Sequence, residues 1–253
     1  MRLRPTILRY VAPRMAEQGY ILIDPGGVAN YTFCNQEHTK TIAFDLDKYM
    51  KRWIRVHFQI FFPLERDMLS FNLEYLKPEL FPKINVVYET QEELDATLIL
   101  LTDKIIEIII PFMDVIQKNA VFQTLEMHEE LAKGTIERAE RFAEKWDLPL
   151  STEPDMLHLD RVMDGLRKDV SQRKNDFYRN QGEIIDMAAY LGELMNIQEN
   201  VPHQWYWRKL SDSDSERFYA TKAQGFDVLS RVIAAWNLGV EVMNYSFRYF
   251  PVR

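Results

Sequence analysis

The chain has 253 residues, of which 47% are hydrophobic and 27% charged, and this composition excludes an intrinsically disordered protein. The net charge of −7 is unevenly spread: residues 61–200 hold 28 acidic against 15 basic side chains, whereas residues 1–60 and 201–253 are slightly basic. The acidic middle argues against nucleic acid as a partner, because phosphate binding requires clustered Lys and Arg.

The compartment is predicted from cysteine usage and apolar segments. Cys34 is the only cysteine, which excludes an intrachain disulfide and a cysteine-based metal cage. We expect it to be a buried, unreactive thiol without a histidine partner. Arg9 and Arg14 interrupt any N-terminal secretory signal. The apolar segment 98–116 carries a polar stripe, which favours a core helix over a membrane span. These features predict a cytoplasmic protein with no membrane partner.

The sequence pattern of the first half of the chain predicts a helix, a series of strands and a second helix. Alternating apolar residues indicate strands over residues 20–23, 29–35, 41–47, 51–62 and 68–76. Short connections, including a turn at 25–27, favour antiparallel pairing, with helices on one face of the sheet. The first helix covers 5–18 and ends at Gly19. Thr90 and Glu93 form a capping box that opens a helix to about Lys118, with a kink at Pro111.

The second half predicts mostly helices and a short strand pair. Helical periodicity covers 124–146, with a break at Gly134, then a segment that reaches about Phe177, and finally 181–198 and 215–237. Residues 203–210 and 240–250 alternate like strands, and Gly239 suits the end of the last helix. We therefore predict an α+β fold of two lobes: residues 1–118 with an antiparallel sheet, and the helix-rich residues 119–253.

Strong motifs of enzyme chemistry are missing. There is no Gly-rich phosphate loop, nucleophile elbow, HExxH or CxxC motif. His128 has no partner at metal-binding spacing and is predicted on an exposed acidic helix face. His158, near Asp155, is predicted in a capping turn with surface ion pairs. No metal and no cofactor are therefore predicted.

One face of the strand over residues 51–62 is the candidate site. Trp53, Arg55, His57 and Gln59 share this face. The neighbouring strands add Asp45, Asp47, Asn72 and Glu74. A histidine between carboxylates and an arginine suits acid–base chemistry near neutral pH. The same residues also describe the ordinary polar side of a half-buried sheet with cross-strand charge pairs, and both interpretations stay open.

The strand over residues 203–210 brings two aromatic side chains to one face. Trp205 and Trp207 alternate along it. Aromatic pairs of this kind stack on nucleobases or sugars in some proteins. In an acidic surrounding, packing between the strand and a helix is the favoured interpretation.

Two stretches resemble known bacterial domains. The helix, strands and Thr-capped helix of residues 5–118 look like bacterial families of unknown function. The segment AAYLGEL at 188–194, followed by HQWYW at 203–207, is similar to small bacterial α+β domains, some of which are suspected interaction or toxin-immunity proteins. Where those domains carry a glycine before the tryptophan strand, this chain has Val201, Pro202 and His203. The resemblance carries over no catalytic residue, and Gly192 and Glu193 serve either helix geometry or function.

These observations give a leading hypothesis and an alternative. We predict a bacterial, non-enzymatic protein-binding module, of immunity type by the resemblance, whose acidic surface suits a basic partner. The alternative is a hydrolase or transferase with a site on the open sheet face near Arg55, His57 and Glu74, or between the lobes. A homo-oligomer formed through the helical lobe is compatible with both.

Overall fold

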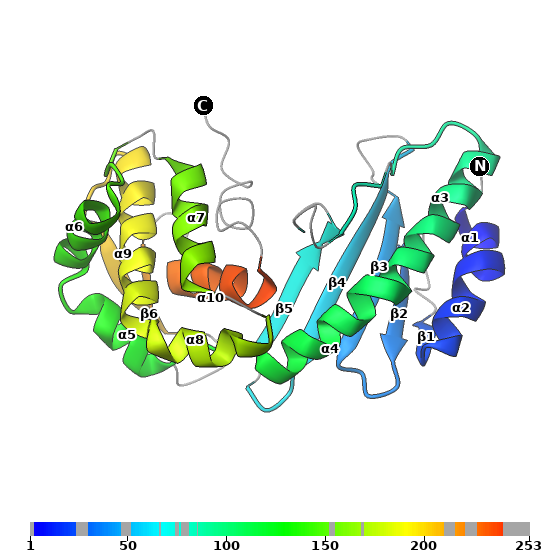
Figure 1. The fold of residues 1–253 in the computed structure, drawn as a ribbon, viewed down its shortest axis with the longest axis horizontal. Helices are drawn as coiled ribbons and strands as arrows, with labels where there is room; N and C mark the ends of the chain where they lie inside the picture. Colours follow the sequence, from blue (N-terminus) through cyan, green and yellow to red (C-terminus); the bar gives the residue numbers. More distant parts are fainter. Residues whose placement is uncertain are drawn as a thin grey trace. The chain divides into compact units, whose positions relative to one another are not determined.

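The computed structural model describes residues 3–23, 30–46, 52–65, 67–73, 76, 81–84, 86–151, 155–167, 170–209, 216–220 and 227–239. The chain divides into two compact units, Met1–Lys118 and Asn119–Arg253. The fold is α+β, as the sequence predicts (Figure 1). Unit 1 holds a five-stranded antiparallel sheet, and unit 2 holds helices and a two-stranded sheet. No helix among the described residues is long and apolar enough to cross a membrane.

The sheet of unit 1 follows the chain order. Its strands are β1 (Tyr20–Ile23), β2 (Asn30–Asn35), β3 (Lys40–Leu46), β4 (Ile54–Phe62) and β5 (Asp67–Asn72), and each pairs antiparallel with the next. Alternate residues of β4 are buried, as the period of two predicts. Ile42, Phe58 and Phe71 lie opposite one another across β3, β4 and β5 and are all buried. One face of the sheet is therefore the core of unit 1.

Helices cover that apolar face (Figure 1). The N-terminal helix runs as α1 (Leu3–Thr6), a π-helical turn η1 (Ile7–Val11) and α2 (Ala12–Glu17). Gly19 follows with a φ of 78°, the left-handed conformation that ends helices. The long helix runs as α3 (Gln91–Lys104), η3 (Ile105–Ile109) and α4 (Ile110–Asn119). The ring of Phe112 on α4 contacts Phe71 of the sheet edge to face, so this helix is packed on the sheet.

The long helix begins as its sequence indicates, and its hydrogen-bond pattern changes just before Pro111. Both hydrogen bonds of the capping box between Thr90 and Glu93 are present. The π-helical turn η3 lies directly before Pro111. In a regular α-helix the proline ring would clash with the carbonyl group four residues earlier, and a π turn changes the hydrogen-bond pattern at that position. The predicted apolar stripe, which includes Leu98, Ile105 and Ile109, is buried.

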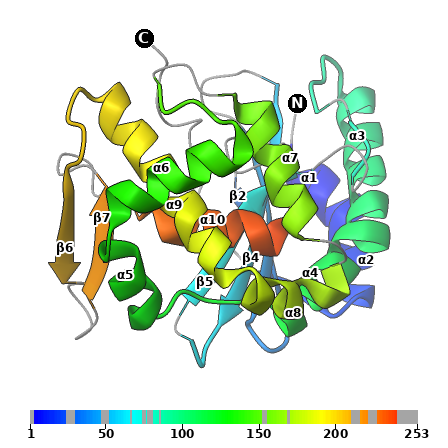
Figure 2. The same cartoon turned by 60° about the vertical axis from the view of Figure 1, so that its left-hand side comes forward.

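Unit 2 is built around one buried helix. Its helices are α5 (Leu125–Ala132), α6 (Thr135–Trp146), α7 (Met156–Leu166), η4 (Val170–Gln172), α8 (Arg173–Arg179), α9 (Gln181–Gln198) and α10 (Val228–Leu238). Every residue of α9 from Ile184 to Asn196 is buried. The predicted break at Gly134 is confirmed, with a φ of 75°. Strands β6 (Trp205–Lys209) and β7 (Glu216–Ala220) form the second sheet, and Figure 2 shows β7 between β6 and the helices.

Two sequence-based boundaries in unit 2 are wrong. The helix expected to reach Phe177 breaks at Arg167, whose backbone is extended. The Arg167 guanidinium is buried and donates to the carbonyl oxygen of Ala235 at 2.7 Å and to Asp164, so tertiary contacts outweigh helical periodicity here. The helix expected from residue 215 begins instead at Val228, because Glu216–Ala220 pair with β6. The turn predicted at 25–27 and the strand predicted at 240–250 lie outside the described residues.

Candidate functional site

The structure brings the described members of the predicted sheet site onto one face. Asp45 of β3 lies directly opposite Arg55 of β4, and Asn72 of β5 lies opposite His57. Paired residues of adjacent strands point to the same side of a sheet, so these four share the face away from the core. Asp47 and Glu74 lie outside the described residues.

Some side chains on this face have partners within the sheet, but the buried indole N–H of Trp53 has no hydrogen-bond partner among the described residues. The Arg55 guanidinium carbon lies 5.8 Å from the centroid of the Trp53 ring. The Gln59 side-chain oxygen accepts a 3.0 Å hydrogen bond from Thr41. The cross-strand neighbours of His57 are Ala43 and Asn72. A carboxylate beside His57, which acid–base catalysis would need, is not among its cross-strand neighbours, and catalytic use of this face stays a prediction.

Cys34 is buried on the same face of the sheet. Burial raises the pKa of its thiol, which keeps the sulfur protonated near neutral pH. The expectation that Cys34 has no histidine partner is wrong: His38, four residues later, places its Nδ1 3.4 Å from the sulfur. His38 lies in a turn with a φ of 56°, and this turn brings the ring back to the strand.

His128 is not on an exposed helix face, as its acidic neighbours in sequence suggested, but is 2% exposed. Its Nδ1 accepts the backbone N–H of Phe218 in β7 at 3.1 Å. Its Nε2 lies 3.0 Å from the side-chain amide of Gln123. Burial lowers the pKa of the imidazole, Asp227 opposes this shift and Arg217 adds to it. The neutral ring therefore fastens β7 to α5.

His158 does lie in a capping turn, as predicted. Its backbone N–H donates to the Asp155 carboxylate at 3.0 Å, which begins α7. Among the residues that the structure describes, no group of three or more His, Cys, Asp and Glu side chains is arranged to hold a metal ion.

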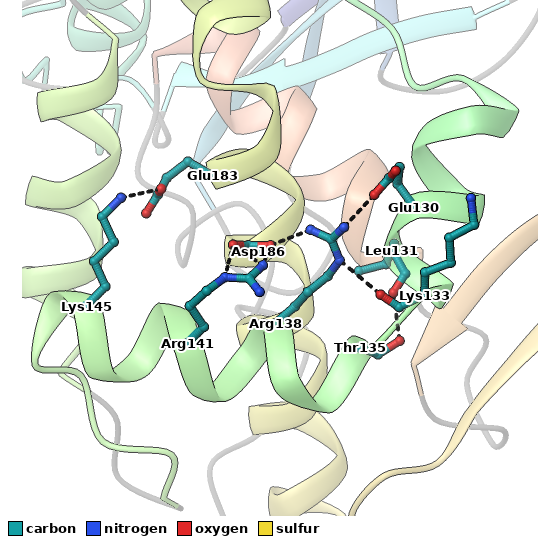
Figure 3. Close-up of polar contacts among 9 residues, drawn as sticks. All are labelled: Glu130, Leu131, Lys133, Thr135, Arg138, Arg141, Lys145, Glu183 and Asp186. Carbon is teal, nitrogen blue, oxygen red and sulfur yellow. Dashed lines mark hydrogen bonds and ion pairs between the residues drawn. The ribbon is translucent and has the colours of Figure 1, made fainter.

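The densest charged network joins α6 to α9 (Figure 3). Arg138 and Arg141 both donate to the buried carboxylate of Asp186, at 2.6 and 2.7 Å. Lys145 pairs with Glu183 one turn earlier on α9. Arg138, Arg141 and Lys145 each have an acidic partner, so these ion pairs fasten the two helices together.

A second buried carboxylate lies further along α9 and holds strand β6. Glu193 is 2% exposed. Its Oε1 accepts the backbone N–H of His203 at 2.8 Å, and its Oε2 accepts the indole N–H of Trp205 at 3.1 Å. Nδ1 of His203 lies 2.9 Å from the same Oε1. One carboxylate thus fixes both the loop before β6 and the first side chain of the strand.

Gly192 makes room for this arrangement. A Cβ atom built on Gly192 would lie 2.1 Å from the nearest carbon of the Trp205 ring. The indole therefore lies directly over the α9 backbone, and its other neighbour is the Phe218 ring, stacked at 5.3 Å with an interplanar angle of 10°. The two parts of the sequence that carry the resemblance, AAYLGEL and HQWYW, form one packed unit. We refer to Gly192, Glu193, His203 and Trp205 as the α9–β6 anchor.

The rest of β6 presents aromatic and basic side chains to solvent. Trp207 is 41% exposed, and Arg208 and Lys209 are exposed. Trp207 leans on Phe218 with ring centroids 5.3 Å apart, and Tyr206 stacks on Tyr219 at 5.8 Å. Within the described part of the chain, β7 is the one strand that pairs with β6. Among the described residues, this anchored strand, paired along one edge and carrying an exposed tryptophan, is the best-defined candidate surface.

Comparisons with known proteins identify no relative of this chain. The sequence matches no protein-family model, no curated protein and no solved structure. The function is therefore inferred from the geometry and sequence of this chain.

Proposed function

We propose that the protein is a protein-binding module of the bacterial cytoplasm that associates through strand β6 of unit 2. The observation that carries the proposal is the exposed side chain of Trp207 on a strand that, among the described strands, is paired along one edge only. The resemblance of AAYLGEL and HQWYW to suspected interaction and immunity domains supports the same class.

The physical chemistry of a strand edge favours protein association. An edge strand presents backbone N–H and C=O groups that an added strand satisfies. Trp and Arg are enriched among the residues that dominate binding energy at interfaces. Trp207 and Arg208 are adjacent on β6 and both exposed, so the edge offers backbone pairing together with two side chains of the favoured types.

The α9–β6 anchor supports this use because it holds β6 in one conformation. The buried Glu193 carboxylate ties down the backbone at His203 and the ring of Trp205 before any partner arrives. A strand that is already ordered loses little conformational entropy on binding, and this raises affinity without additional contacts.

A photo-crosslinking amino acid at position 207, tested in cells of the native host, would test the proposal. We expect a discrete protein adduct from position 207, a second copy of the chain included, and its loss on adding Arg208→Glu. Leu157, which is 68% exposed on α7, is the matched control position and should give no such adduct. A catalytic turnover that disappears in a point mutant, with no adduct at 207, would contradict the proposal.

The α9–β6 anchor also favours a second candidate function, a hydrolase or transferase that uses His203. A buried carboxylate that orients one ring nitrogen leaves the other nitrogen to move a proton, and the His203 side chain is 55% exposed. His203 also has a φ of 64°, a strained conformation that clusters at functional sites. His203→Gln should abolish any turnover detected on ester and phosphoester substrates; unchanged turnover would exclude this site.

A further inference from the structure

We infer that the protein docked on β6 is a second copy of this chain, paired antiparallel about Trp207, and this rests on the proposed use of β6 in protein binding. Antiparallel pairing of two β6 strands centred on Trp207 places Trp207 opposite its own copy. Tyr206 of each strand then lies opposite Arg208 of the other, and Trp205 opposite Lys209. The aromatic half of WYWRK thus faces the basic half.

This register gives each exposed side chain a suitable neighbour. Trp207 of one copy would extend the aromatic row that already includes Phe218, so that four rings lie side by side across the pair. Arg208 would lie beside the Tyr206 ring of the other copy, an arrangement that favours a cation–π contact. Within one copy Arg208 lies opposite Arg217, a like-charge pair that a neighbouring π face would help to offset.

The same charges disfavour the alternatives. Parallel pairing in register would place Arg208 opposite Arg208 and Lys209 opposite Lys209, and like charges directly opposite each other destabilise a sheet. Basic residues at an edge strand also prevent indiscriminate pairing with other strands. The pattern therefore favours antiparallel pairing, which closes with two-fold symmetry because each strand supplies the same surface to the other.

The expected dimer is weak. Only five residues of each strand are paired, over a length of about 17 Å. Their contact area is small compared with the ~800 Å² that each partner buries in a standard interface. We expect dimers at high protein concentration that dissociate on dilution, with a blue shift of tryptophan fluorescence as Trp207 becomes covered. Trp207→Asp should abolish both changes, whereas Leu157→Asp, at the exposed α7 position, should leave them intact.

Cysteine cross-linking tests the register. In a Cys34→Ala background, Trp207→Cys should form disulfide-linked dimers, because directly opposed residues have Cα atoms ~4.5–5.5 Å apart, within disulfide reach. Lys209→Cys is the matched control on the same strand. In the proposed register its two copies lie about four residues apart along the strands, roughly 13 Å, and should not cross-link.

The outcomes separate this inference from the proposed function. Dimers in light scattering, with cross-linking at 207 and not at 209, support it. A chain that stays monomeric at every concentration, yet forms an adduct with a different protein from position 207 that is lost on adding Arg208→Glu, overturns the second copy as partner and leaves β6 as a binding strand. A monomer without any adduct at 207 contradicts both. Cross-linking at 209 but not 207 overturns the two-fold register.

Discussion

Strands β4 and β6 differ both in burial and in surroundings, since buried and less buried residues alternate along β4 but not along β6. β4 lies between β3 and β5, and on its open face Arg55 lies directly opposite Asp45 of β3. β6 pairs with β7 alone among the described strands, and its exposed residues are aromatic and basic. β4 has a strand on each side, whereas β6 has one edge without a partner among the described strands. The position of each strand in its sheet and its pattern of burial both separate these two candidate sites.

The two strands are also held differently. β4 is held by an apolar core in which Phe58 stacks on Phe71 at 5.0 Å. β6 depends on a few specific contacts with α9, which include a buried carboxylate and a glycine under an indole ring. Single substitutions should therefore disturb β6 much more than the open face of the sheet. Four of the five tryptophans lie in residues 119–253, so tryptophan fluorescence mainly reports the unfolding of unit 2.

The largest expected effect is that of Gly192→Ala. The added methyl group meets the Trp205 ring, which must move and lose its hydrogen bond to Glu193. We expect the free energy of unfolding to fall by about 3 kcal/mol, at the upper end for overpacking, as measured by urea denaturation. Gly182→Ala on the same helix meets nothing within 4 Å and should stabilise by about 0.5–1 kcal/mol. Equal effects at both positions would show that Trp205 does not lie on α9.

Glu193→Gln should have the next largest effect. The amide keeps the shape of the side chain but turns one acceptor oxygen into a donor that faces the N–H groups of His203 or Trp205. We expect a loss of about 2 kcal/mol, because a buried donor is left unsatisfied, together with weaker association through β6. Glu140→Gln, on the exposed side of α6, is the control and should change neither stability nor association.

Acid should loosen the β6–β7 sheet through His128. Because burial lowers the pKa of this imidazole, the folded ring is neutral while the unfolded ring binds a proton near pH 6.5. The stabilisation is therefore present above about pH 6.5 and is lost as pH falls through the folded pKa. His128→Asn retains an acceptor near the Phe218 N–H but does not titrate. In this variant the free energy of unfolding, measured by urea titration at a series of pH values, should fall less in acid. If the variant loses as much stability in acid as the unaltered protein, groups other than His128 cause the loss.

His57→Ala should have the smallest effect. The ring is half-buried beside Ala43 and Asn72, and surface substitutions of this kind usually change stability by less than about 0.5 kcal/mol. Association through β6 should be unchanged. If this variant loses a measurable turnover, the open face of β4 and not strand β6 is the functional site, and the protein is an enzyme.

Much of the fold follows from local patterns in the sequence. The capping box at Thr90, the left-handed glycines at positions 19, 134 and 239, and the alternation of β4 act over a few residues, and all are confirmed. The candidate site was harder to predict from the sequence. The grouping of Asp45 with Arg55 followed from strand alternation, but the pairing of Glu193 with Trp205 joins residues twelve positions apart, across a turn in which His203 has a positive φ. Only the resemblance pointed to both segments.

The sequence by itself determined the α+β class, most helix and strand positions and the absence of strong catalytic motifs, because these depend on composition, periodicity and end signals. Only the tertiary structure decided that Glu216–Ala220 is a strand, that the helix before residue 177 breaks at Arg167, and that His128 is buried. In each case a long-range hydrogen bond or strand pair outweighs a local preference of a few tenths of a kcal/mol per residue. The same reason places Trp207 on an edge: its neighbours are set by the path of the chain and not by the pattern of WYWRK.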